Sequence, residues 1–505
     1  MKIEEIINID NTIPVGWEVV LLDDLVLKIF AGGDKPDEVS NEKTEEFSYP
    51  IFSNGLKDKG LYGYSNAYRV DEECITISAR GTIGYTEVRT PKFTPIVRLI
   101  VIVPTEYTLS KYLKFYFENL IVEKSGTSIP QLTVPMIKPI PIKLPPLNEQ
   151  KRIVAKIEKL FSNLDNSDKY LLHLEKQLKR YRQSVLKSAF EGELTKEWRE
   201  NKTNLETADE LLENIKKERI LYIKNEIREK FKDKPEKWIK DKINSGIKKY
   251  LESLIILRND ILPKSWSETF LQCLTFEHTQ DIVDGPFGSN LKASEYQESG
   301  IPIIRLQNID RNIFIDKNIQ FVSEKKAEQL KRHSYKQGDI VITKLGAPLG
   351  KACIIPDTID NGIIVADVVR LRLFEKYFDK KYVSYFINSN YPISQLEVLV
   401  KGTTRPRVNL THIRELRVYI CSILEQKEIV NQIEKHFSII DKLEIVVQQS
   451  IKESKRLRQS ILKQAFEGKL VEQDPNDESA SLLLEKIAKA KEEYLKVQKK
   501  QVRKK

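Results

Sequence analysis

Two stretches of the chain carry apolar residues at alternating steps of four and three positions. In the first stretch this spacing runs from residue 153 to 188, and nine of its eleven positions are apolar: Ile153, Ile157, Leu160, Leu164, Leu171, Leu174, Leu178, Tyr181 and Val185. The second stretch keeps seven: Ile429, Ile433, Ile440, Leu443, Val447, Leu457 and Ile461. Because an apolar residue about every 3.5 positions forms one narrow stripe along a helix, each stretch predicts a long helix with a coiled-coil seam.

The first of these helices is expected to run over residues 147–190, a length of roughly 65 Å at ~1.5 Å per residue. Gly192 and Gly468 each follow an Ala-Phe-Glu sequence and are well placed to cap the helix C-termini. Such a helix can pack along its own globular neighbour, but a stripe this long and narrow fits a second helix better. We expect the two helices to pair, either antiparallel or parallel. Antiparallel pairing would relate the two halves of the chain by a pseudo-twofold axis.

The two helices belong to a larger internal repeat with an offset of 276 residues. RQSVLKSAFEGEL at 182–194 returns as RQSILKQAFEGKL at 458–470, and GTSIPQL at 126–132 returns as GTTRPRV at 402–408. Matches this long and this well aligned indicate duplication, so the chain consists of two related halves.

Each half begins with a globular region rich in strand-like sequence. IPVGW at 13–17 is similar to LPKSW at 262–266, and ITISARGTIG at 75–84 is similar to IVITKLGAPLG at 340–350. The second pair is apolar and alternating and runs into a glycine turn, as a strand followed by a loop does, which predicts an α/β fold. The expected segments are an N-terminal globular domain at 1–146, a long helix at 147–192, a charged helical linker at 193–261, a C-terminal globular domain at 262–422, a second long helix at 423–470 and a charged helical tail at 471–505.

Composition narrows the class of protein. The 505 residues, 40% of them hydrophobic, are enough for two or more cores. The longest apolar runs are broken well before the ~20 residues of a membrane span, and the first ten residues lack the apolar core of a signal peptide, so we expect a soluble, cytoplasmic protein without membrane contact. The four cysteines are far apart, which favours buried thiols over disulfides or structural zinc: Cys74, Cys273, Cys353 and Cys421.

The formal charge of +10 favours a polyanion partner, but it is unevenly distributed. Residues 1–146 carry −4, whereas 147–262, 263–420 and 421–505 carry +6, +4 and +4. If the N-terminal region binds DNA, it must therefore do so through a local basic surface.

The chain lacks the usual motifs of catalysis. GAPLGKA at 346–352 has three residues between its glycines where a phosphate loop has four, and Ala352 stands where such a loop carries Ser or Thr. The N-P-P-Y and D-P-P-Y sequences of amino-methyltransferases are absent, and the five histidines are not clustered. We therefore expect a binding protein and no enzyme.

Together these features resemble the specificity subunit of type I restriction-modification systems over nearly the whole chain. The resemblance is carried by the helix entries LPPLNEQKRIV at 144–154 and SILEQKEIV at 422–430, by the paired AFEG helix endings, and by DPNDESASLLLEKI at 474–487. In addition, DGPFGSNLKASEYQESGIPIIRLQNI at 284–309 and GDIVITKLGAPLGKACI at 338–354 are similar to the family's target-recognition domains.

The resemblance implies two α/β target-recognition domains joined by an antiparallel coiled coil. Each domain would read one half of an asymmetric, bipartite DNA site, and helix length would set the spacer between the halves. The implied partners are double-stranded DNA, two adenine methyltransferase subunits that bring S-adenosylmethionine, and motor-nuclease subunits that use ATP and Mg²⁺. This chain would itself hold no cofactor or metal, and would direct its partners in defence against phage.

Candidate DNA contacts are polar residues on glycine-rich turns, because Arg, Lys, Asn and Gln read base edges while Lys, Ser and Thr bind phosphates. In the N-terminal domain they are Asn54, Lys57, Lys59, Tyr62, Arg80, Thr82, Lys124, Ser125, Thr127 and Gln131. In the C-terminal domain they are Ser289, Asn290, Lys292, Arg305, Gln307, Asn308, Thr343, Lys344, Lys351, Lys401, Thr403, Thr404, Arg405, Arg407 and Asn409. Each residue type also serves to cap turns or face solvent.

The strongest candidate is KGTTRPRVN at 401–409, which holds three cations in nine residues. Its counterpart KSGTSIPQL at 124–132 keeps the Gly, Thr and Pro but only one cation. The shared residues indicate either a common backbone role with different base reading or simply a common turn of the fold.

Two further questions stay open at this level. A coiled-coil adaptor with protein-binding globular domains would show the same helices, but it would not bind DNA sequence-specifically. The linker at 193–261 is either a solvated connection or a docking surface. Docking is favoured by an apolar pattern shared with the tail: Leu211, Leu212 and Ile215 recur as Leu483, Leu484 and Ile487.

Overall fold

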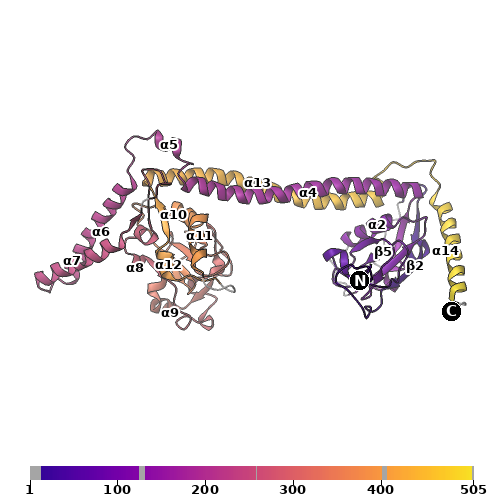
Figure 1. Ribbon diagram of the computed structural model, residues 1–505, viewed down its shortest axis with the longest axis horizontal. Helices are drawn as coiled ribbons and strands as arrows, with labels where there is room; N and C mark the ends of the chain where they lie inside the picture. Colours follow the sequence, from indigo (N-terminus) through magenta and orange to yellow (C-terminus); the bar gives the residue numbers. More distant parts are fainter. Residues whose placement is uncertain (1–12, 124–130, 258, 401–405, 503–505) are drawn as a thin grey trace. The chain divides into compact units, whose positions relative to one another are not determined.

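The computed structural model describes residues 13–123, 131–257, 259–400 and 406–502. The chain divides into two compact units, one made of Met1–His173 with Val447–Lys505 and the other of Leu174–Val446. The border passes through the middle of both long helices, so each unit contains one globular domain and one half of each helix (Figure 1). Sheets and helices occur in both units, which confirms the predicted α/β class.

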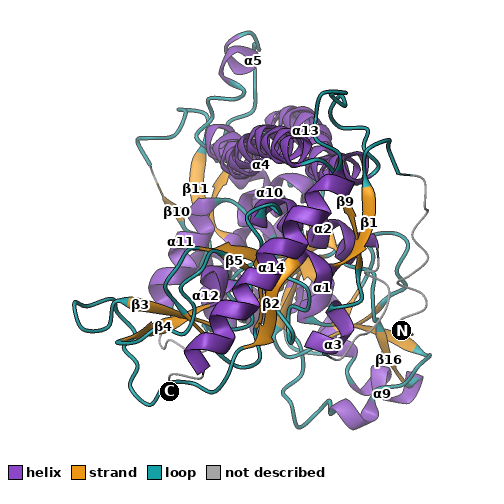
Figure 2. Ribbon diagram, turned by 90° about the vertical axis from the view of Figure 1, so that its right-hand side faces the viewer, coloured by secondary structure: helices purple, strands orange, loops and turns teal. Residues whose placement is uncertain are grey.

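Two 44-residue helices, α4 (Leu147–Phe190) and α13 (Ile423–Phe466), contain the two predicted seams. Within each unit, one half of α4 lies alongside the opposite half of α13 (Figures 1 and 2). Arg458 of α13 contacts Asp165 of α4 in one unit. Arg182, farther along α4, contacts Asp441, which lies earlier in α13. Rising residue numbers on one helix meet falling numbers on the other, so the halves pair antiparallel.

The coiled-coil seam is buried along most of its predicted length. The buried seam residues are Ile153, Ile157, Leu178, Val185, Ile429, Ile433, Ile440, Val447 and Ile461. Tyr181, Leu443 and Leu457 are 48%, 43% and 50% exposed, although the ring of Tyr181 still packs against His436 of the other helix. Leu186 and Leu462 are buried instead.

The first unit's domain is built on a four-stranded antiparallel sheet in the order β2-β8-β5-β6. A three-stranded sheet has the order β4-β3-β7, and β1 pairs with β9 just before α4. Helix α2 packs on β5 and β6, and every residue of β5 is buried. The elements are β1 (Glu18–Leu21), α1 (Leu22–Leu25), β2 (Val26–Ala31), β3 (Tyr49–Phe52), β4 (Leu61–Ser65), β5 (Cys74–Ile77), β6 (Thr86–Arg89), β7 (Thr94–Pro95), β8 (Ile100–Pro104), α2 (Ser110–Glu123), α3 (Val134–Ile137) and β9 (Pro141–Leu144).

The second unit's domain repeats this topology, with the sheet β12-β21-β18-β19 in place of β2-β8-β5-β6 and a larger sheet β16-β13-β20-β17. A further sheet has the order β10-β11-β22, and β14 pairs with β15. The strands are β10 (Ile256–Leu257), β11 (Ser267–Phe270), β12 (Ile282–Asp284), β13 (Ile301–Ile304), β14 (Ile309–Asp310), β15 (Ile313–Phe314), β16 (Gln320–Val322), β17 (Ser334–Tyr335), β18 (Ile340–Thr343), β19 (Ala352–Ile354), β20 (Gly362–Ile364), β21 (Val368–Leu371) and β22 (Arg417–Ile420). The helices are α8 (His278–Asp281), α9 (Glu324–Gln329), α10 (Lys380–Ile387), α11 (Asn390–Leu399) and α12 (Leu410–Arg414).

The charged segments are helical, as expected: α5 (Lys196–Glu200), α6 (Ala208–Lys230), α7 (Glu236–Ser253) and α14 (Ala480–Val502). Helices α6 and α14 begin in the same way, since Ala208 donates its N–H to the carbonyl of Ser265 and Ala480 to that of Gly16, both at 2.9 Å. The apolar residues that favoured docking pack inside the chain: Leu211, Leu212, Ile215, Leu483 and Ile487 are buried, and Leu484 is half-buried. They are therefore not available to a partner, which removes the basis of that hypothesis.

All four cysteines are free and buried, as the sequence predicted. Among the residues that the structure describes, no helix combines the length and apolar character needed to cross a bilayer. The same residues contain no group of three or more His, Cys, Asp and Glu side chains arranged to hold a metal ion.

Candidate nucleic-acid interface

Each long helix is locked to its own domain by a buried Glu-Gln pair in its first turn. Glu149 accepts a hydrogen bond of 3.0 Å from the indole of Trp17, and Glu425 accepts one of 2.9 Å from Trp266. Gln150 and Gln426 each donate to backbone carbonyls in the preceding domain. The four side chains are buried, so the domain and the start of its helix form one rigid body in each unit.

The opposite end of each helix docks on the domain of the other half. Phe466 of α13 packs edge-on against Tyr116 with ring centroids 4.9 Å apart, and Phe190 of α4 packs against Phe386 at the same distance. Gly192 and Gly468 have φ of +79° and +70°, which confirms them as C-terminal caps. The duplicated AFEG sequence thus ends a helix and fastens it to a domain.

In the N-terminal domain, the loops at the end of β5 and around β7 come together. Asn54 holds them, because its carbonyl oxygen accepts the N–H of Ala79 and its amide donates to the carbonyl of Val97, both at 2.7 Å. Leu132 donates its backbone N–H to Ala79 at 3.0 Å. The exposed guanidinium of Arg80 donates to the side chain of Gln131 at 3.0 Å.

The C-terminal domain repeats this arrangement with different side chains. Val408 donates its backbone N–H to the carbonyl of Lys344 at 3.0 Å, as Leu132 does to Ala79. Arg407 pairs with Leu345 in an isolated β-bridge, and its side chain forms an ion pair of 2.8 Å with Asp367. The last residues of the two aligned segments, Leu132 and Val408, therefore share a backbone role. The polar groups that they present differ, with Gln131 in one domain and Arg407 in the other.

Two glycines permit the close approach of the loops. A Cβ on Gly285 would lie 2.0 Å from the carbonyl oxygen of Val365, and one on Gly32 would lie 2.7 Å from the carbonyl carbon of Pro95. These glycines follow β12 and β2, the equivalent first strands of the two sheets. Because no side chain fits there, the two loops pack backbone against backbone at these glycines.

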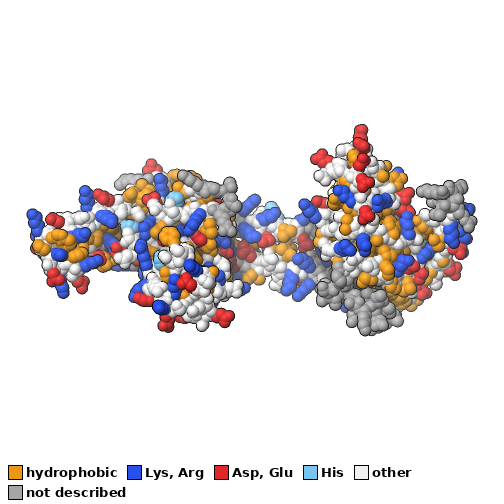
Figure 3. Space-filling view, turned by 90° about the horizontal axis from the view of Figure 1, so that it is seen from below, with side chains coloured by type: hydrophobic (Ala, Val, Ile, Leu, Met, Phe, Trp, Pro, Cys, Tyr) orange, Lys and Arg blue, Asp and Glu red, His pale blue; other side chains and the backbone are white. Residues whose placement is uncertain are grey.

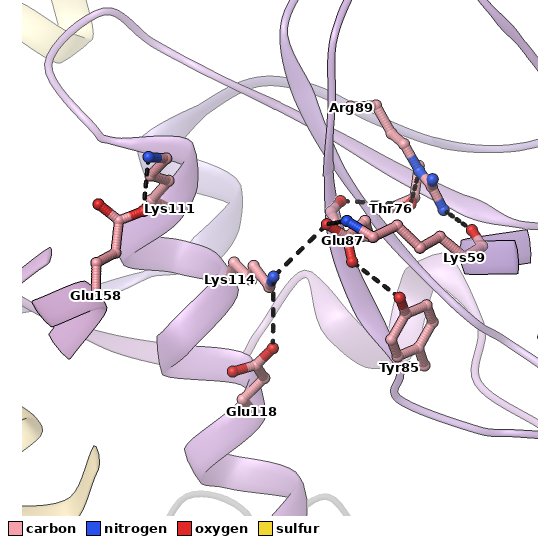
Figure 4. A network of polar contacts seen from close by, with 9 residues as sticks. All are labelled: Lys59, Thr76, Tyr85, Glu87, Arg89, Lys111, Lys114, Glu118 and Glu158. Carbon is pink, nitrogen blue, oxygen red and sulfur yellow. Dashed lines mark hydrogen bonds and ion pairs between the residues drawn. The ribbon is translucent and has the colours of Figure 1, made fainter. Parts of the chain in front are cut away.

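Most described candidates in the N-terminal domain lie on the surface. Lys57, Lys59, Tyr62, Arg80 and Thr82 are exposed. Lys59 forms an ion pair of 3.3 Å with Glu87, which also accepts a hydrogen bond of 2.8 Å from the hydroxyl of Tyr85 (Figure 4).

Burial opposes ionisation of Glu87, but the hydrogen bond from Tyr85 and the charges of Lys114 and Lys59 together hold its pKa below the usual range. The Glu87 side chain therefore stays ionised and keeps its ion pair with Lys59 near the loops.

In the C-terminal domain, Ser289, Asn290, Lys292, Gln307, Arg407 and Asn409 are exposed. Arg305 is half-buried and donates to the carbonyl of Asn318 at 2.6 Å, and Asn409 caps α12 by accepting the N–H of His412. Lys351 forms an ion pair of 2.9 Å with Asp310 and thereby lowers the pKa of that carboxyl group.

Four candidates are corrected because the structure uses them internally. Asn308 is fully buried and donates to the carbonyls of Ile315 and Lys317. Thr343 is buried and accepts the N–H of Lys351. Lys344 is buried in an ion pair of 2.7 Å with Asp284. Both the oxygen and the nitrogen of the Asn54 side-chain amide form hydrogen bonds with backbone groups, as described above. None of these side chains is free to read a base.

Seven candidates lie outside the described residues: Lys124, Ser125, Thr127, Lys401, Thr403, Thr404 and Arg405. Two exposed residues at the loops were missed by the sequence analysis. Arg98 lies in a turn with φ of +59°, and the only signal for it was a charge that interrupts the apolar run PIVRLIVIVP. Phe287 is 71% exposed in the loop after β12, where an aromatic residue beside glycines could have been noticed.

The repeated loop clusters and paired helices agree with a family model for the type I restriction modification DNA specificity domain, which matches residues 14–176 and 285–453. This chain belongs to the type I restriction-modification specificity family. The two matched segments contain β1–β9 and β13–β22 with their loops and both long helices up to residues 176 and 453, whereas α6 and α7 lie outside them.

Curated relatives of the family match either most of this chain or one part of it. The chain is 26% identical over 487 residues to the type I restriction enzyme EcoDI specificity subunit of Escherichia coli, an alignment that covers 94% of this chain and 95% of that protein. It is 39% identical over 141 residues to a type I specificity subunit of Mycoplasma pneumoniae, covering 28% of this chain but only 42% of that relative.

A solved structure concerned with complex assembly and conformational transition of the type I R-M system contains a chain of similar fold. The TM-score is 0.60 at 17% identity, and the match covers 91% of this chain and 100% of that one. At this identity the likeness concerns the fold, and it places this specificity chain in the same architecture.

Proposed function

We propose that this chain is the DNA-recognition subunit of a type I restriction-modification complex, in which each globular domain reads one half of an asymmetric, bipartite site. The observation that carries this proposal is the duplicated loop cluster. The same backbone hydrogen bond, from Leu132 to Ala79 and from Val408 to Lys344, recurs in both domains while the exposed polar side chains differ. Two copies of one scaffold with different polar groups suit two different half-sites.

The chemistry of the loops supports DNA as the ligand. Arg80 and Arg407 are exposed, and a guanidinium can donate two hydrogen bonds to the edge of guanine in the major groove. Lys57, Thr82 and Ser289 are also exposed on loops of the two domains and suit phosphate oxygens. We expect affinity to fall steeply with salt, because phosphate neutralisation contributes a large part of it.

Catalysis is assigned to partners in this proposal. Two methyltransferase subunits would bring S-adenosylmethionine, and motor-nuclease subunits would use ATP and Mg²⁺. The middle of the long helices offers exposed apolar residues for such partners, including Tyr170 at 66% and Val446 at 58% exposure, which occupy equivalent positions in the repeat. Duplicated surfaces of this kind suit two copies of one partner.

The proposal is tested by sequencing methylated adenines in the host with and without the gene. Loss of one bipartite methylated motif is the expected result, and an unchanged methylome in a host that expresses the system would contradict it. Replacing residues 1–146 with the corresponding domain of another family member should change one half of the motif only. A change in both halves would exclude two independent readers, and a coiled-coil adaptor would leave methylation untouched.

A further inference from the structure

The hairpin of α6 and α7 is fixed to the C-terminal domain at its base. Besides the buried residues of its first turns, Glu218 of α6 accepts a hydrogen bond of 2.7 Å from the hydroxyl of Tyr377 and pairs with Lys376. At the next residue, the guanidinium of Arg219 lies 4.7 Å from the ring centre of Phe276. The hairpin is therefore anchored from one side, and its later turns extend away from this base (Figure 1).

Beyond its base the hairpin is held together by its own contacts. Gly246 of α7 lies so close to α6 that a Cβ there would be 3.1 Å from Ile223. Ile239 and Ile243 are buried between the helices. Phe231 and Trp238 pack edge to face at 5.0 Å where the two helices join. The hairpin is thus a preformed element, and it needs no folding on binding.

The free part of the hairpin is strongly basic. Residues 221–253 contain ten Lys and Arg side chains against six Asp and Glu. All ten cations are exposed: Lys224, Arg228, Lys230, Lys232, Lys234, Lys237, Lys240, Lys242, Lys248 and Lys249. None of them forms an ion pair with any carboxylate in the described part of the chain, and Figure 3 shows Lys and Arg side chains gathered on this hairpin.

The equivalent helix of the other half differs. On α14, Lys486 and Lys496 are paired with Glu478 and Glu492 at 2.7 and 3.1 Å, and no second helix folds back on it among the described residues. Among the described residues, a basic two-helix hairpin therefore follows α4 and not α13. It also lies outside the two segments that match the family model.

We propose that the α6–α7 hairpin is an accessory arm that binds the phosphate backbone of duplex DNA flanking the half-site read by the C-terminal domain. This rests on the proposed function for its location on DNA. Lys237, Lys240 and Lys248 lie on one stripe of α7, which also includes the single carboxylate Asp241, since their spacing brings them to the same face of a helix. The stripe is about 16 Å long, and a duplex carries one negative charge per ~1.7 Å of axis. A row of unpaired lysines on a rigid support suits such a surface and carries no sequence preference.

The test compares two DNA probes and two triple variants of the full-length chain. One probe ends at the edge of the C-terminal half-site and the other extends about 20 base pairs beyond it, roughly two helical turns. The arm variant is Lys237→Gln, Lys240→Gln and Lys248→Gln. The matched control changes three exposed, unpaired lysines of α4 by the same charge: Lys151→Gln, Lys156→Gln and Lys159→Gln. Affinity is measured over a range of salt concentrations.

Wild type should bind the extended probe more tightly than the short one, with a steeper salt dependence. The arm variant should lose that gain, and its slope of log K against log salt should fall by about 0.9 for each phosphate contact removed. An arm variant that keeps the wild-type slope on the extended probe would overturn the proposal and leave a partner protein as the occupant. Normal binding to the short probe serves as the check on folding. An outcome against the proposed function can be told apart from an outcome against the hairpin, because the wild-type chain itself would then bind DNA without preference for any sequence.

Discussion

Arg182 on α4 and Asp441 on α13 form an ion pair of 2.6 Å that joins the two long helices. The same guanidinium lies 3.1 Å from Glu444 and 4.6 Å from the ring centre of Phe437. The other unit contains the same arrangement around Arg458. The duplicated RQS sequence therefore supplies one cross-helix clasp in each unit.

Reversing the charge of Arg182 should destabilise the chain, and reversing the charge of its partner Asp441 as well should recover part of the lost stability. Arg182→Glu is expected to cost about 1–2 kcal/mol, because a partly exposed pair contributes up to ~1 kcal/mol and the new carboxylate repels Asp441 and Glu444. Adding Asp441→Arg should recover part of this loss in thermal unfolding. Combining Arg458→Glu with Asp441→Arg is the control. It should show no recovery, because Arg458 contacts Asp165 and not Asp441.

Two glycines that cap the long helices should tolerate no side chain. In Gly468 a Cβ would lie 2.1 Å from Cγ of Pro14, and in Gly192 it would lie 2.4 Å from Cγ of Pro263, in addition to the strain of a positive φ. Gly468→Ala is therefore expected to lower stability by about 2–4 kcal/mol. Gly16→Ala is a matched control, since Gly16 also has a positive φ of +85° but meets nothing within 4 Å. It should cost only about 1 kcal/mol. Equal melting temperatures for the two variants would contradict a role for the proline contacts.

Changes at the two loop clusters should affect the two half-sites separately. Arg80→Ala should weaken discrimination in the N-terminal half-site only, and Arg407→Ala in the C-terminal half-site only. The expected loss is about 1–3 kcal/mol, roughly 5- to 150-fold, as for one specific base contact. Binding to DNA pools randomised in one half at a time measures this. A uniform loss over both halves would mean that these arginines contact phosphates and carry no sequence information.

The helical frame was predictable because its signals are local and repeated. The seam positions, the Gly192 and Gly468 caps and the alignment of the two halves all follow from short-range spacing in the sequence. The spacing does not predict how deeply each position is buried: Leu443 and Leu457 are 43% and 50% exposed, while Ile461, farther along the same repeat, is buried.

The candidate site was less predictable, because a polar residue on a glycine-rich turn can point either way. Asn308, Thr343 and Lys344 are the same residue types as the exposed Asn290, Thr82 and Lys57. Their direction is decided by distant partners, such as Asp284 for Lys344, and the sequence pattern contains no trace of that pairing. Arg98 was hidden for the converse reason, since it lies in an apolar run that reads as one strand.

A half-buried carboxyl group on α2 should make the first unit less stable as pH rises. Burial raises the pKa of Glu118 to about 7, helped by the charge of Glu87 and opposed by Lys114. In the unfolded chain the group ionises near pH 4.5, so between pH 4.5 and 7 the folded state retains a proton that the unfolded state has lost. Stability contributed by the neutral form is therefore present below pH 4.5, falls as pH rises through this window and is fully lost above pH 7.

Glu118→Gln removes the charge that burial penalises, and it should therefore stabilise the protein at alkaline pH only. At pH 8 we expect a gain of about 1–2 kcal/mol, less than the full pKa difference implies because the side chain is 31% exposed. The melting temperature should rise by a few degrees at pH 8 and stay near wild type at pH 4.5. Glu158→Gln is the control, since Glu158 is 45% exposed in its ion pair with Lys111 on the neighbouring surface (Figure 4). If both variants shift the melting temperature equally at the two pH values, burial of Glu118 does not govern the pH response.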